Sequence, residues 1–395
     1  MKVAGIIAEY NPFHNGHAYH IAKTREQADA VICIISGAFT QRGVPAVVNK
    51  WARAKMAIKN GADLVLELPF PFSAAPAEIF AFGGVDLLNK IGCVDILSFG
   101  SEIGELKTLM KTARLLQEKG KEISKSVKDR AGEGKSYAAA VAEALGELEE
   151  SGAMESPNNL LGIKYLMAMN RLNVNFEPFT VKREGGYNSL SLEGDFASAA
   201  AIRRAISENV DFSGFMPENT IEVLEQEIRA GRIYKLSNID AFFTGLLRRN
   251  ENFADIAYVA EGVENRFVKA AENCFTIEDI IAFVKTKRYT HTRLSRISAS
   301  ILVGMDKNVL AENVASGVAY ARVLGANAVG TALIRHIKEN IPVISRGADY
   351  VNLNEYGKKQ FELEMRAGNI CALCAEKPSE RIANTDLLKC PYIER

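Results

Sequence analysis

The sequence predicts an α/β fold, in which a parallel sheet wound with helices on both faces is followed by a mainly helical region. Two observations predict this fold class. Four apolar runs of about strand length occur within the first 101 residues, and amphipathic stretches separate them. Charged residues barely interrupt these runs, which is typical of strands buried on both faces of a parallel sheet.

The elements of the first half follow in order. Strands are expected at 3–10, 30–37, 63–70 and 95–101. Amphipathic helices are expected at 49–60 and 76–91. Residues 106–150 have the pattern of charged helix, with a Gly-rich loop at 131–136.

The second half is less regular. A helix is expected to begin near Pro157, because proline is favoured at the first position of a helix. An extended stretch follows at 173–188. The segment 211–325 is mostly helical by period, and 340–346 has the pattern of a late strand.

The length of 395 residues exceeds that of one ordinary compact domain, so we expect two. The boundary is placed near residue 210, although no Pro-, Gly- or Ser-rich linker marks it. This division gives an α/β domain over 1–210 and a mainly helical domain over 211–395.

Composition and charge exclude several classes. Apolar residues make up 48% and charged residues 24%, which is ordinary for a globular protein and argues against disorder. The net charge is +0, so any nucleic-acid role must come from a local basic patch. No apolar run is long enough to span a bilayer, and Glu9 comes too early for a secretory signal. We therefore expect a cytoplasmic protein without a membrane partner.

The six cysteines are too few for a disulfide scaffold. Cys371 and Cys374 form a C-x-x-C pair, and Cys390 follows sixteen residues later. Three thiolates hold zinc only if a fourth ligand comes from elsewhere, and no second pair has matching spacing. Packing is the commoner role, so no metal site is predicted.

Polar residues gather where the predicted strands end. The segments after the four strands are 9–20, 36–45, 69–76 and 100–102. The carboxyl ends of parallel strands share one edge of a sheet, and ligands of doubly wound folds bind there. We expect the site at this edge.

His14 and His17 lie three residues apart with Gly16 between them, where the first strand passes into a helix. A helix N-terminus offers unpaired N–H groups to a phosphate, and imidazoles can donate hydrogen bonds to its oxygens. A single histidine more often caps a helix or fills space, which is the role we expect for His20. Two at this turn favour nucleotide chemistry.

The segment GIIAEYNPFHNGH resembles the HxGH signature of the nucleotidyltransferase superfamily, which includes class I aminoacyl-tRNA synthetases. Four further segments, at 36–69, 156–166, 197–206 and 289–296, occur in the order and approximate spacing of the bacterial tRNA(Met) cytidine acetate ligase family. The resemblance extends from residue 1 to at least about residue 345. It implies a HUP or Rossmann-like nucleotidyltransferase domain that binds ATP, followed by a domain that could bind tRNA.

That family activates acetate with ATP, forms acetyl-adenylate, releases pyrophosphate and acetylates the wobble cytidine of elongator methionine tRNA. Mg²⁺ is the expected companion of the triphosphate and is expected to be held mainly by its oxygens. The resemblance implies that His14, His17 and Arg203 are catalytic. The residues that it implies for ATP binding are Ile7, Ala8, Glu9, Tyr10, Asn11, Pro12, Phe13, His14, Asn15, Gly16, His17, Gly100, Asn158, Asn159, Arg183, Ser198 and Arg203.

Some of these residues have simpler explanations. Ser198 and Arg203 alone could be a helix cap and a surface cation, and one of Asn158 and Asn159 is expected to cap a helix. The sequence does not decide which asparagine faces the ligand.

The chain also departs from the family pattern. Asn usually stands where this chain has Ala38, an acid where it has Val44, and His where it has Asn188. Gln41 and Arg42 remain as candidates for the acetate pocket, since Arg pairs well with carboxylates.

A basic stretch provides the candidate tRNA contact. Residues 285–296 contain no acid, and they include Tyr289 and His291. Cations interleaved with an aromatic residue suit phosphate contacts and base stacking on RNA, although a charge run is more often a solvated face. The predicted tRNA-binding cations are Lys285, Lys287, Arg288, Arg293 and Arg296.

Three functions remain open. The favoured function is an ATP-dependent acetate–tRNA ligase. A small-molecule nucleotidyltransferase would use the same phosphate site but would leave residues 285–296 unexplained. A catalytically silent RNA- or nucleotide-binding protein would fit the departures at Ala38 and Asn188.

Overall fold

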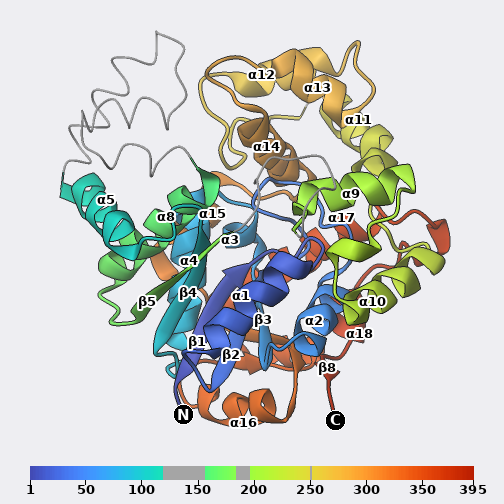
Figure 1. The fold of residues 1–395 in the computed structure, drawn as a ribbon. Helices are drawn as coiled ribbons and strands as arrows, with labels where there is room; N and C mark the ends of the chain where they lie inside the picture. The colour runs from blue at the N-terminus through green and yellow to red at the C-terminus, as the bar shows by residue number, and fades with distance from the viewer. Residues whose placement is uncertain (119–155, 184–195, 250) are drawn as a thin grey trace.

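The computed structural model describes residues 1–118, 156–183, 196–249 and 251–395 (Figure 1). The Gly-rich loop predicted at 131–136, the predicted charged helix beyond residue 118, and Asn188 lie outside the described residues.

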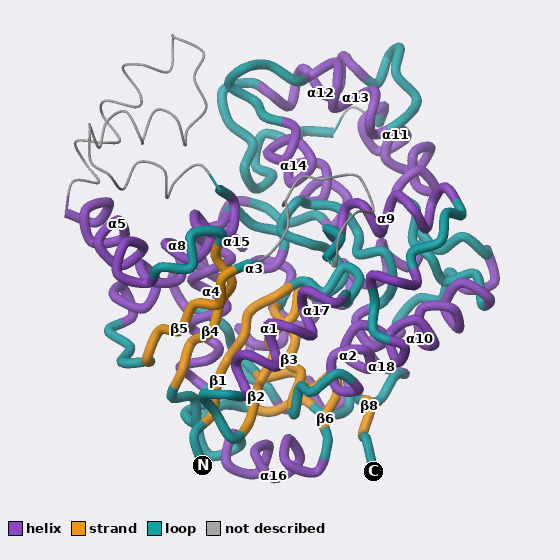
Figure 2. Tube along the Cα trace, in the orientation of Figure 1, coloured by secondary structure: helices purple, strands orange, loops and turns teal. Residues whose placement is uncertain are grey.

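One mixed β-sheet forms the centre of the described chain (Figure 2). Its order is β5-β4-β1-β2-β3-β6-β7, and β8 pairs with β6 beside this path. Strands β1 to β5 are parallel, whereas β6 is antiparallel to β3. The strands are Val3–Ala8 (β1), Ala30–Ser36 (β2), Leu64–Leu68 (β3), Ile96–Ser101 (β4), Glu177–Lys182 (β5), Ala321–Ala326 (β6), Val343–Ile344 (β7) and Tyr392–Ile393 (β8).

The predicted α/β class is confirmed, with the four strands of the first half present as β1 to β4. The predicted late strand is β7, and the predicted extended stretch contains β5. The helical prediction for residues 321–325 is wrong, because these residues belong to β6. A short buried apolar run has no periodicity that separates a strand from a helix.

Helices cover both faces of the sheet because alternate strand residues point to opposite sides. One face packs against α4 (Ala77–Lys90), α5 (Leu106–Glu118), α8 (Pro157–Leu172) and α16 (Ala328–Ile337). The other packs against α1 (Asn15–Arg25), α2 (Lys50–Lys59), α9 (Ala199–Glu208) and α10 (Glu218–Arg229).

A third apolar cluster builds a helical lobe above the sheet (Figure 1). It contains α11 (Asp240–Arg248), α12 (Val263–Ala270), α13 (Ile277–Val284) and α14 (His291–Val303). Among the described residues, the remaining α-helices are α3 (Phe70–Ser73), α15 (Lys307–Ser316), α17 (Glu355–Ala372) and α18 (Thr385–Leu388).

A buried ionic cluster ties the C-terminal segment to the sheet. The Lys50 ammonium group on α2 contacts the carboxylates of Glu67 on β3, Glu364 on α17 and Asp386 on α18. Arg322 of β6 lies against the same carboxylates of Glu67 and Asp386. Burial and the adjacent Glu67 charge raise the pKa of Glu364 well above its usual value. The boundary near residue 210 stays a prediction, but the sheet and this cluster cross it.

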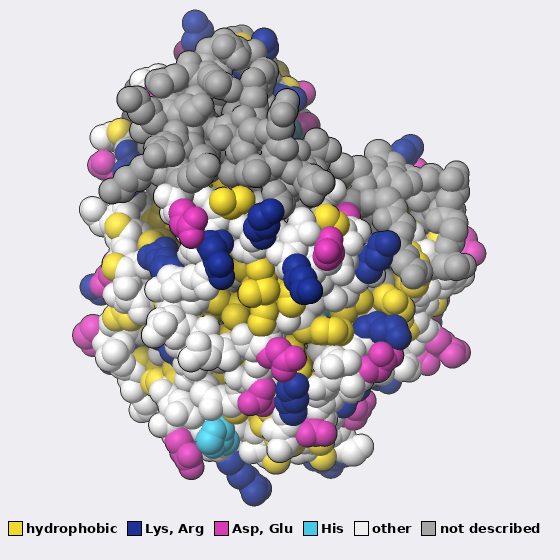
Figure 3. Space-filling view, turned by 60° about the vertical axis from the view of Figure 1, so that its left-hand side comes forward, with side chains coloured by type: hydrophobic (Ala, Val, Ile, Leu, Met, Phe, Trp, Pro, Cys, Tyr) yellow, Lys and Arg dark blue, Asp and Glu magenta, His cyan; other side chains and the backbone are white. Residues whose placement is uncertain are grey.

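Within the described ranges, no helix has both the length and the apolar character needed to cross a membrane. Figure 3 shows acidic and basic side chains interspersed over one face of the molecule, as the zero net charge leads one to expect.

Candidate active site

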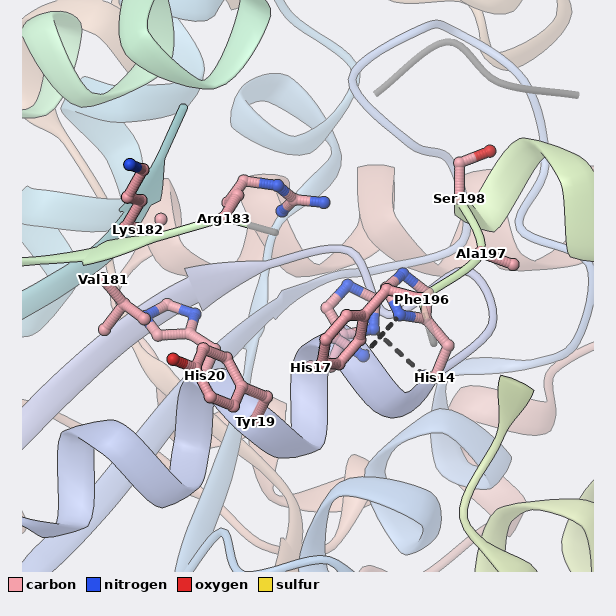
Figure 4. Close-up of a pocket in the computed structure, with 12 residues that line it drawn as sticks. His14, His17, Tyr19, His20, Val181, Lys182, Arg183, Phe196, Ala197 and Ser198 are labelled. Carbon is pink, nitrogen blue, oxygen red and sulfur yellow. Dashed lines mark hydrogen bonds between the residues drawn. The ribbon is translucent and has the colours of Figure 1, made fainter. Parts of the chain in front are cut away.

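The carboxyl ends of β1, β2 and β4 open into a cleft at the predicted edge of the sheet. Two adjoining cavities, which share part of their walls, form it. Residues lining both cavities come from the turn between β1 and α1, from α1 itself, from β4, from the end of β5 and from the start of α9. They are His14, His17, His20, Gly100, Arg183 and Ser198. Figure 4 shows the smaller cavity, with His14, His17, His20, Arg183 and Ser198 around it.

The start of α1 holds two imidazoles in defined orientations. His14 is the N-cap residue, and its Nδ1 accepts a hydrogen bond from the Gly16 N–H at 3.1 Å. The His17 Nδ1 accepts from the His14 N–H at 3.2 Å, and the ring centroids lie 3.7 Å apart. Because each Nδ1 is an acceptor, each neutral ring carries its hydrogen on Nε2. Each histidine therefore offers one Nε2–H donor.

Gly16 makes this arrangement possible. A Cβ atom at Gly16 would lie 3.0 Å from Cε1 and 3.1 Å from Nδ1 of the His14 ring. A larger residue would push the imidazole away from the helix N-terminus, so the glycine serves the packing of His14 as well as ligand approach.

All three cleft histidines are neutral near pH 7. Burial, followed by the charges of Arg183 and Arg203, lowers the pKa of His14 from 6.5 to about 3. Burial and the charge of Arg183 likewise lower the pKa of His20 to about 3. The pKa of His17 also falls well below 6.5, mainly because of burial and the adjacent His14.

His20 has a partner inside the protein. Its Nε2 lies 2.9 Å from the Ser98 Oγ, and the Thr24 hydroxyl lies 2.7 Å from the same oxygen. The sequence assigned His20 to packing. The structure gives it this bond but also a place in the cleft wall.

Two arginines reach the cleft from distant segments. Gly100 leaves space for the Arg183 side chain, since a Cβ atom at Gly100 would lie 3.2 Å from the Arg183 Cγ. Arg203 donates from Nη1 to the Asn11 carbonyl oxygen at 2.7 Å. Ser198 is the N-cap residue of α9, and its hydroxyl accepts from the Ala201 N–H at 3.0 Å.

The two asparagines at the start of α8 differ in position. Asn159 is buried, and its Oδ1 accepts from the N–H groups of Glu102 and Ile103 at 2.9 and 3.2 Å. Asn158 lines the cleft, and its Nδ2 donates to the Glu102 carboxylate at 2.6 Å. Geometry therefore favours Asn158 as the residue that faces a ligand.

The loop after β2 borders the same cleft. Gln41 and Arg42 line it, and the Gln41 N–H donates to the Glu9 carboxylate at 2.8 Å. Of the two departures in this loop, Val44 lines the cleft. Ala38 lines neither cavity and packs in a buried cluster instead.

Most predicted ATP-binding residues line one of the cavities. The exceptions are Pro12, Phe13, Asn15 and Asn159. Phe13 is buried against Tyr10, and the Asn15 amide donates to the Gly214 carbonyl oxygen at 3.1 Å.

Sequence reasoning missed the apolar wall of the cleft. That wall comes from α4, β4 and α8, and its residues are Phe80, Phe99, Leu161 and Tyr165. No local signal marks these residues, because each resembles an ordinary core position of its own element.

The predicted tRNA-binding stretch is only partly exposed. Lys285, Lys287 and Arg288 are exposed, but Arg288 forms an ion pair with Glu261, so the prediction of uncompensated cations is wrong there. The predicted stacking role of Tyr289 is also wrong. Its ring is buried, its hydroxyl donates to the Ala260 carbonyl oxygen at 2.9 Å, and Arg293 lies 4.6 Å above it.

Arg296 joins this stretch to the cleft. It donates from Nη1 to the Gln41 carbonyl oxygen at 3.2 Å. Gly43, with φ of 75°, lets the loop approach the α14 backbone, since a Cβ atom there would lie 2.6 Å from the Arg296 nitrogen.

Metal ligands do not cluster in the part of the chain that the structure describes. No group of three or more His, Cys, Asp or Glu side chains there could hold a metal ion. Cys371 and Cys374 are buried free thiols, whereas Cys390 is exposed. The Cys371 thiol donates to the Ala38 carbonyl oxygen at 3.5 Å.

Comparison with known proteins agrees with this geometry. Residues 1–386 match the family described as HIGH nucleotidyl transferase. The chain is 39% identical to the tRNA(Met) cytidine acetate ligase of Acetivibrio thermocellus, over 98% of each chain. It is 42% identical to that of Caldicellulosiruptor saccharolyticus, over 94% of each chain.

The chain belongs to the tRNA(Met) cytidine acetate ligase family. A solved structure of Thermotoga maritima TmcAL bound with alpha-thio ATP matches with a TM-score of 0.91 and 31% identity over the whole of both chains. The apo structure of the same protein matches with a TM-score of 0.93, also with 31% identity and full coverage. The family predicted from the five sequence segments is thus confirmed.

Proposed function

We propose that the protein activates acetate with ATP and transfers the acetyl group to N4 of the wobble cytidine of elongator methionine tRNA. The observation that carries this proposal is the pair of neutral imidazoles at the start of α1, in a chain whose relatives bear the name tRNA(Met) cytidine acetate ligase. The reaction belongs in the cytoplasm, where tRNA is modified.

In the first step, an acetate oxygen attacks the α-phosphorus of ATP, and the bond to the leaving pyrophosphate breaks. Negative charge grows on the phosphate oxygens as this happens. The Nε2–H donors of His14 and His17 and the N–H groups at the start of α1 suit that charge. Arg183 and Arg203 add positive charge in the same cleft. The protein supplies orientation and electrostatic stabilisation rather than a covalent nucleophile.

Binding of the triphosphate is expected to raise the pKa of the imidazoles. A polyanion next to an imidazole favours the protonated form, which opposes the effect of burial.

Gln41 and Arg42 are the proposed acetate site. They line the cleft next to the turn that carries His14, and the Arg42 guanidinium can pair with a carboxylate. Mg²⁺ would be held mainly by the triphosphate oxygens, because Glu9 is the one carboxylate among the described residues that line the cleft.

The tRNA is proposed to lie over α13 and α14. Lys285, Lys287 and Arg288 would contact phosphates there, with Arg293 beside them. Arg296 bonds the cleft loop directly, so RNA bound at α14 would sit close to the proposed acetate site.

The test is pyrophosphate release from radiolabelled ATP, with and without acetate, followed by transfer of labelled acetate to methionine tRNA. Release that requires acetate, together with label in N4-acetylcytidine, is expected. Release driven by a phosphorylated metabolite without RNA would instead indicate a small-molecule nucleotidyltransferase. Binding of ATP and RNA without turnover would indicate a silent binding protein.

A further inference from the structure

The described walls of the cleft carry one carboxylate among several cationic side chains. Among the described residues that line its two cavities, Glu9 is the one acidic side chain. The cationic side chains of the same walls are Arg42, Lys182, Arg183 and Arg203. A carboxylate works against binding a polyanion, so its presence calls for another role.

The Glu9 side chain has a defined position. Glu9 follows β1 directly, and its carboxylate Oε1 accepts the Gln41 N–H at 2.8 Å. Its own carbonyl oxygen accepts from Nη1 of the buried Arg53 at 2.7 Å. Glu9 therefore lies between the turn that carries His14 and the loop that carries the proposed acetate site.

Its backbone is held from a second side as well. Arg53 also donates from Nη2 to the Gly37 carbonyl oxygen, at the end of the neighbouring strand β2. One buried guanidinium thus joins the ends of β1 and β2. The half-buried Glu9 carboxylate is presented to the cleft by a rigid support rather than by a loose loop.

The second step of the proposed reaction needs a proton acceptor. The cytidine N4 amino group attacks the acetyl carbonyl carbon, and one of its hydrogens must leave as a proton. A carboxylate oxygen is a suitable acceptor for the N4 amino group of cytosine. The imidazole Nδ1 atoms of His14 and His17 are already occupied by backbone N–H groups.

We infer that the Glu9 carboxylate receives the N4 amino group of the cytidine and takes its proton during acetyl transfer. This inference rests on the proposed function and assigns one residue to its second step. Glu9 is then a catalytic residue of acetyl transfer, in addition to its contact with the Gln41 N–H.

The step balances. The N4–carbon bond forms as the carbon–oxygen bond to the adenylate phosphate breaks, and AMP leaves with that electron pair. The N4 proton moves to the Glu9 carboxylate and is later released to solvent. The proposed reaction supplies both the acceptor of the acetyl group, which is the cytidine N4, and the leaving group, which is AMP.

The experiment compares the two half-reactions in the variant Glu9→Gln. The glutamine keeps an amide oxygen for the Gln41 N–H, but an amide does not take up a proton near neutral pH. Acetate-dependent ATP–pyrophosphate exchange reports the first step, and single-turnover transfer of labelled acetate to tRNA reports the second. General-base catalysis contributes about 10²–10⁴-fold, so the ratio of transfer to exchange should fall at least about 100-fold.

Two control variants sharpen the comparison. Glu78→Gln changes an exposed glutamate on α4 that lines neither cavity, and both of its rates should match wild type. Glu9→Asp keeps a carboxylate, so it should recover part of the transfer rate. If Glu9→Gln fails to fold by its melting temperature, Glu9→Ala, which also removes the carboxylate, takes its place in the same comparison.

Equal losses of exchange and transfer in Glu9→Gln would overturn the inference, because Glu9 would then serve nucleotide or metal binding. Transfer at the wild-type rate would overturn it as well. Failure of the proposed function itself is distinguishable, since wild-type protein would then show no acetate-dependent exchange.

Discussion

Replacing His17 with Asn tests the imidazole pair at the start of α1. In the structure, the His17 Nδ1 accepts the His14 N–H at 3.2 Å. The Asn Oδ1 is the same number of bonds from Cα, so His17→Asn keeps an acceptor for this N–H. The substitution removes the Nε2–H that we assign to the phosphate. The fold should therefore persist while adenylation suffers.

The magnitude follows from the loss of one donor to a developing anion, which costs about 2.7–4 kcal/mol of transition-state stabilisation, or about 10²–10³-fold in rate. We expect that loss in acetate-dependent ATP–pyrophosphate exchange at saturating ATP. Circular dichroism and the melting temperature should remain close to those of wild type.

His20→Asn is the matched control, because His20 is a half-buried, neutral histidine on the same helix. Its Nε2 is already bonded to the Ser98 hydroxyl at 2.9 Å. Loss of an ordinary hydrogen bond of about 1 kcal/mol predicts no more than about a fivefold effect on exchange. Exchange by His17→Asn above a tenth of the wild-type rate would refute the assigned role. An equal loss in His20→Asn would do the same.

Three further predictions concern the basic stretch, the two asparagines of α8 and the titration of His14. Replacing both Lys287 and Arg288 with Ala should weaken tRNA binding and flatten its salt dependence, while ATP–pyrophosphate exchange stays at the wild-type rate. Unchanged tRNA affinity in a salt titration would show that residues 285–296 do not belong to the binding surface. Asn158→Ala should raise the KM for ATP. Asn159→Ala leaves two backbone N–H groups without an acceptor, so it should lower the free energy of unfolding by about 1–3 kcal/mol or more in urea titrations with little change in the KM for ATP. The reverse pattern would exchange the roles of the two asparagines. The pKa of His14 is about 3 in the folded protein and about 6.5 in the unfolded protein, so the unfolded state binds the proton first as the pH falls. Protonation of His14 in the unfolded state should therefore lower the free energy of unfolding by about 3 kcal/mol between pH 7 and 4.5. His14→Asn should be spared that loss, and identical pH dependence of unfolding in the two proteins would contradict the neutral, buried state.

Much of the site could be predicted because its central part is local. The strand ending at Ala8, the turn, and the helix from Asn15 lie within one short stretch of chain. The positions of glycine and proline and the periodic spacing of the apolar residues largely specify such a stretch without the rest of the chain. The parallel strands β1 to β4 then bring the segments that follow them to one edge of the sheet, as general rules of doubly wound folds require.

Other features could not be predicted because they depend on residues far apart in the chain. Nothing near Tyr289 indicates that its ring is buried beneath Arg293 with its hydroxyl on the Ala260 carbonyl. The choice between Asn158 and Asn159 depends on how each meets Glu102, just after β4, because Asn159 accepts from its backbone N–H whereas Asn158 donates to its carboxylate. The local sequence pattern is the same for the two asparagines.

The sequence by itself determined the α/β class, the strands of the first half and the turn that carries His14 and His17, because these follow from contacts within contiguous segments. The tertiary structure alone decided that β6 pairs antiparallel with β3, and that Lys50 meets carboxylates from β3, α17 and α18. It also decided that the cleft histidines are neutral. Pairing, burial and pKa shifts all arise from the neighbours that folding brings together, and no local pattern specifies those neighbours.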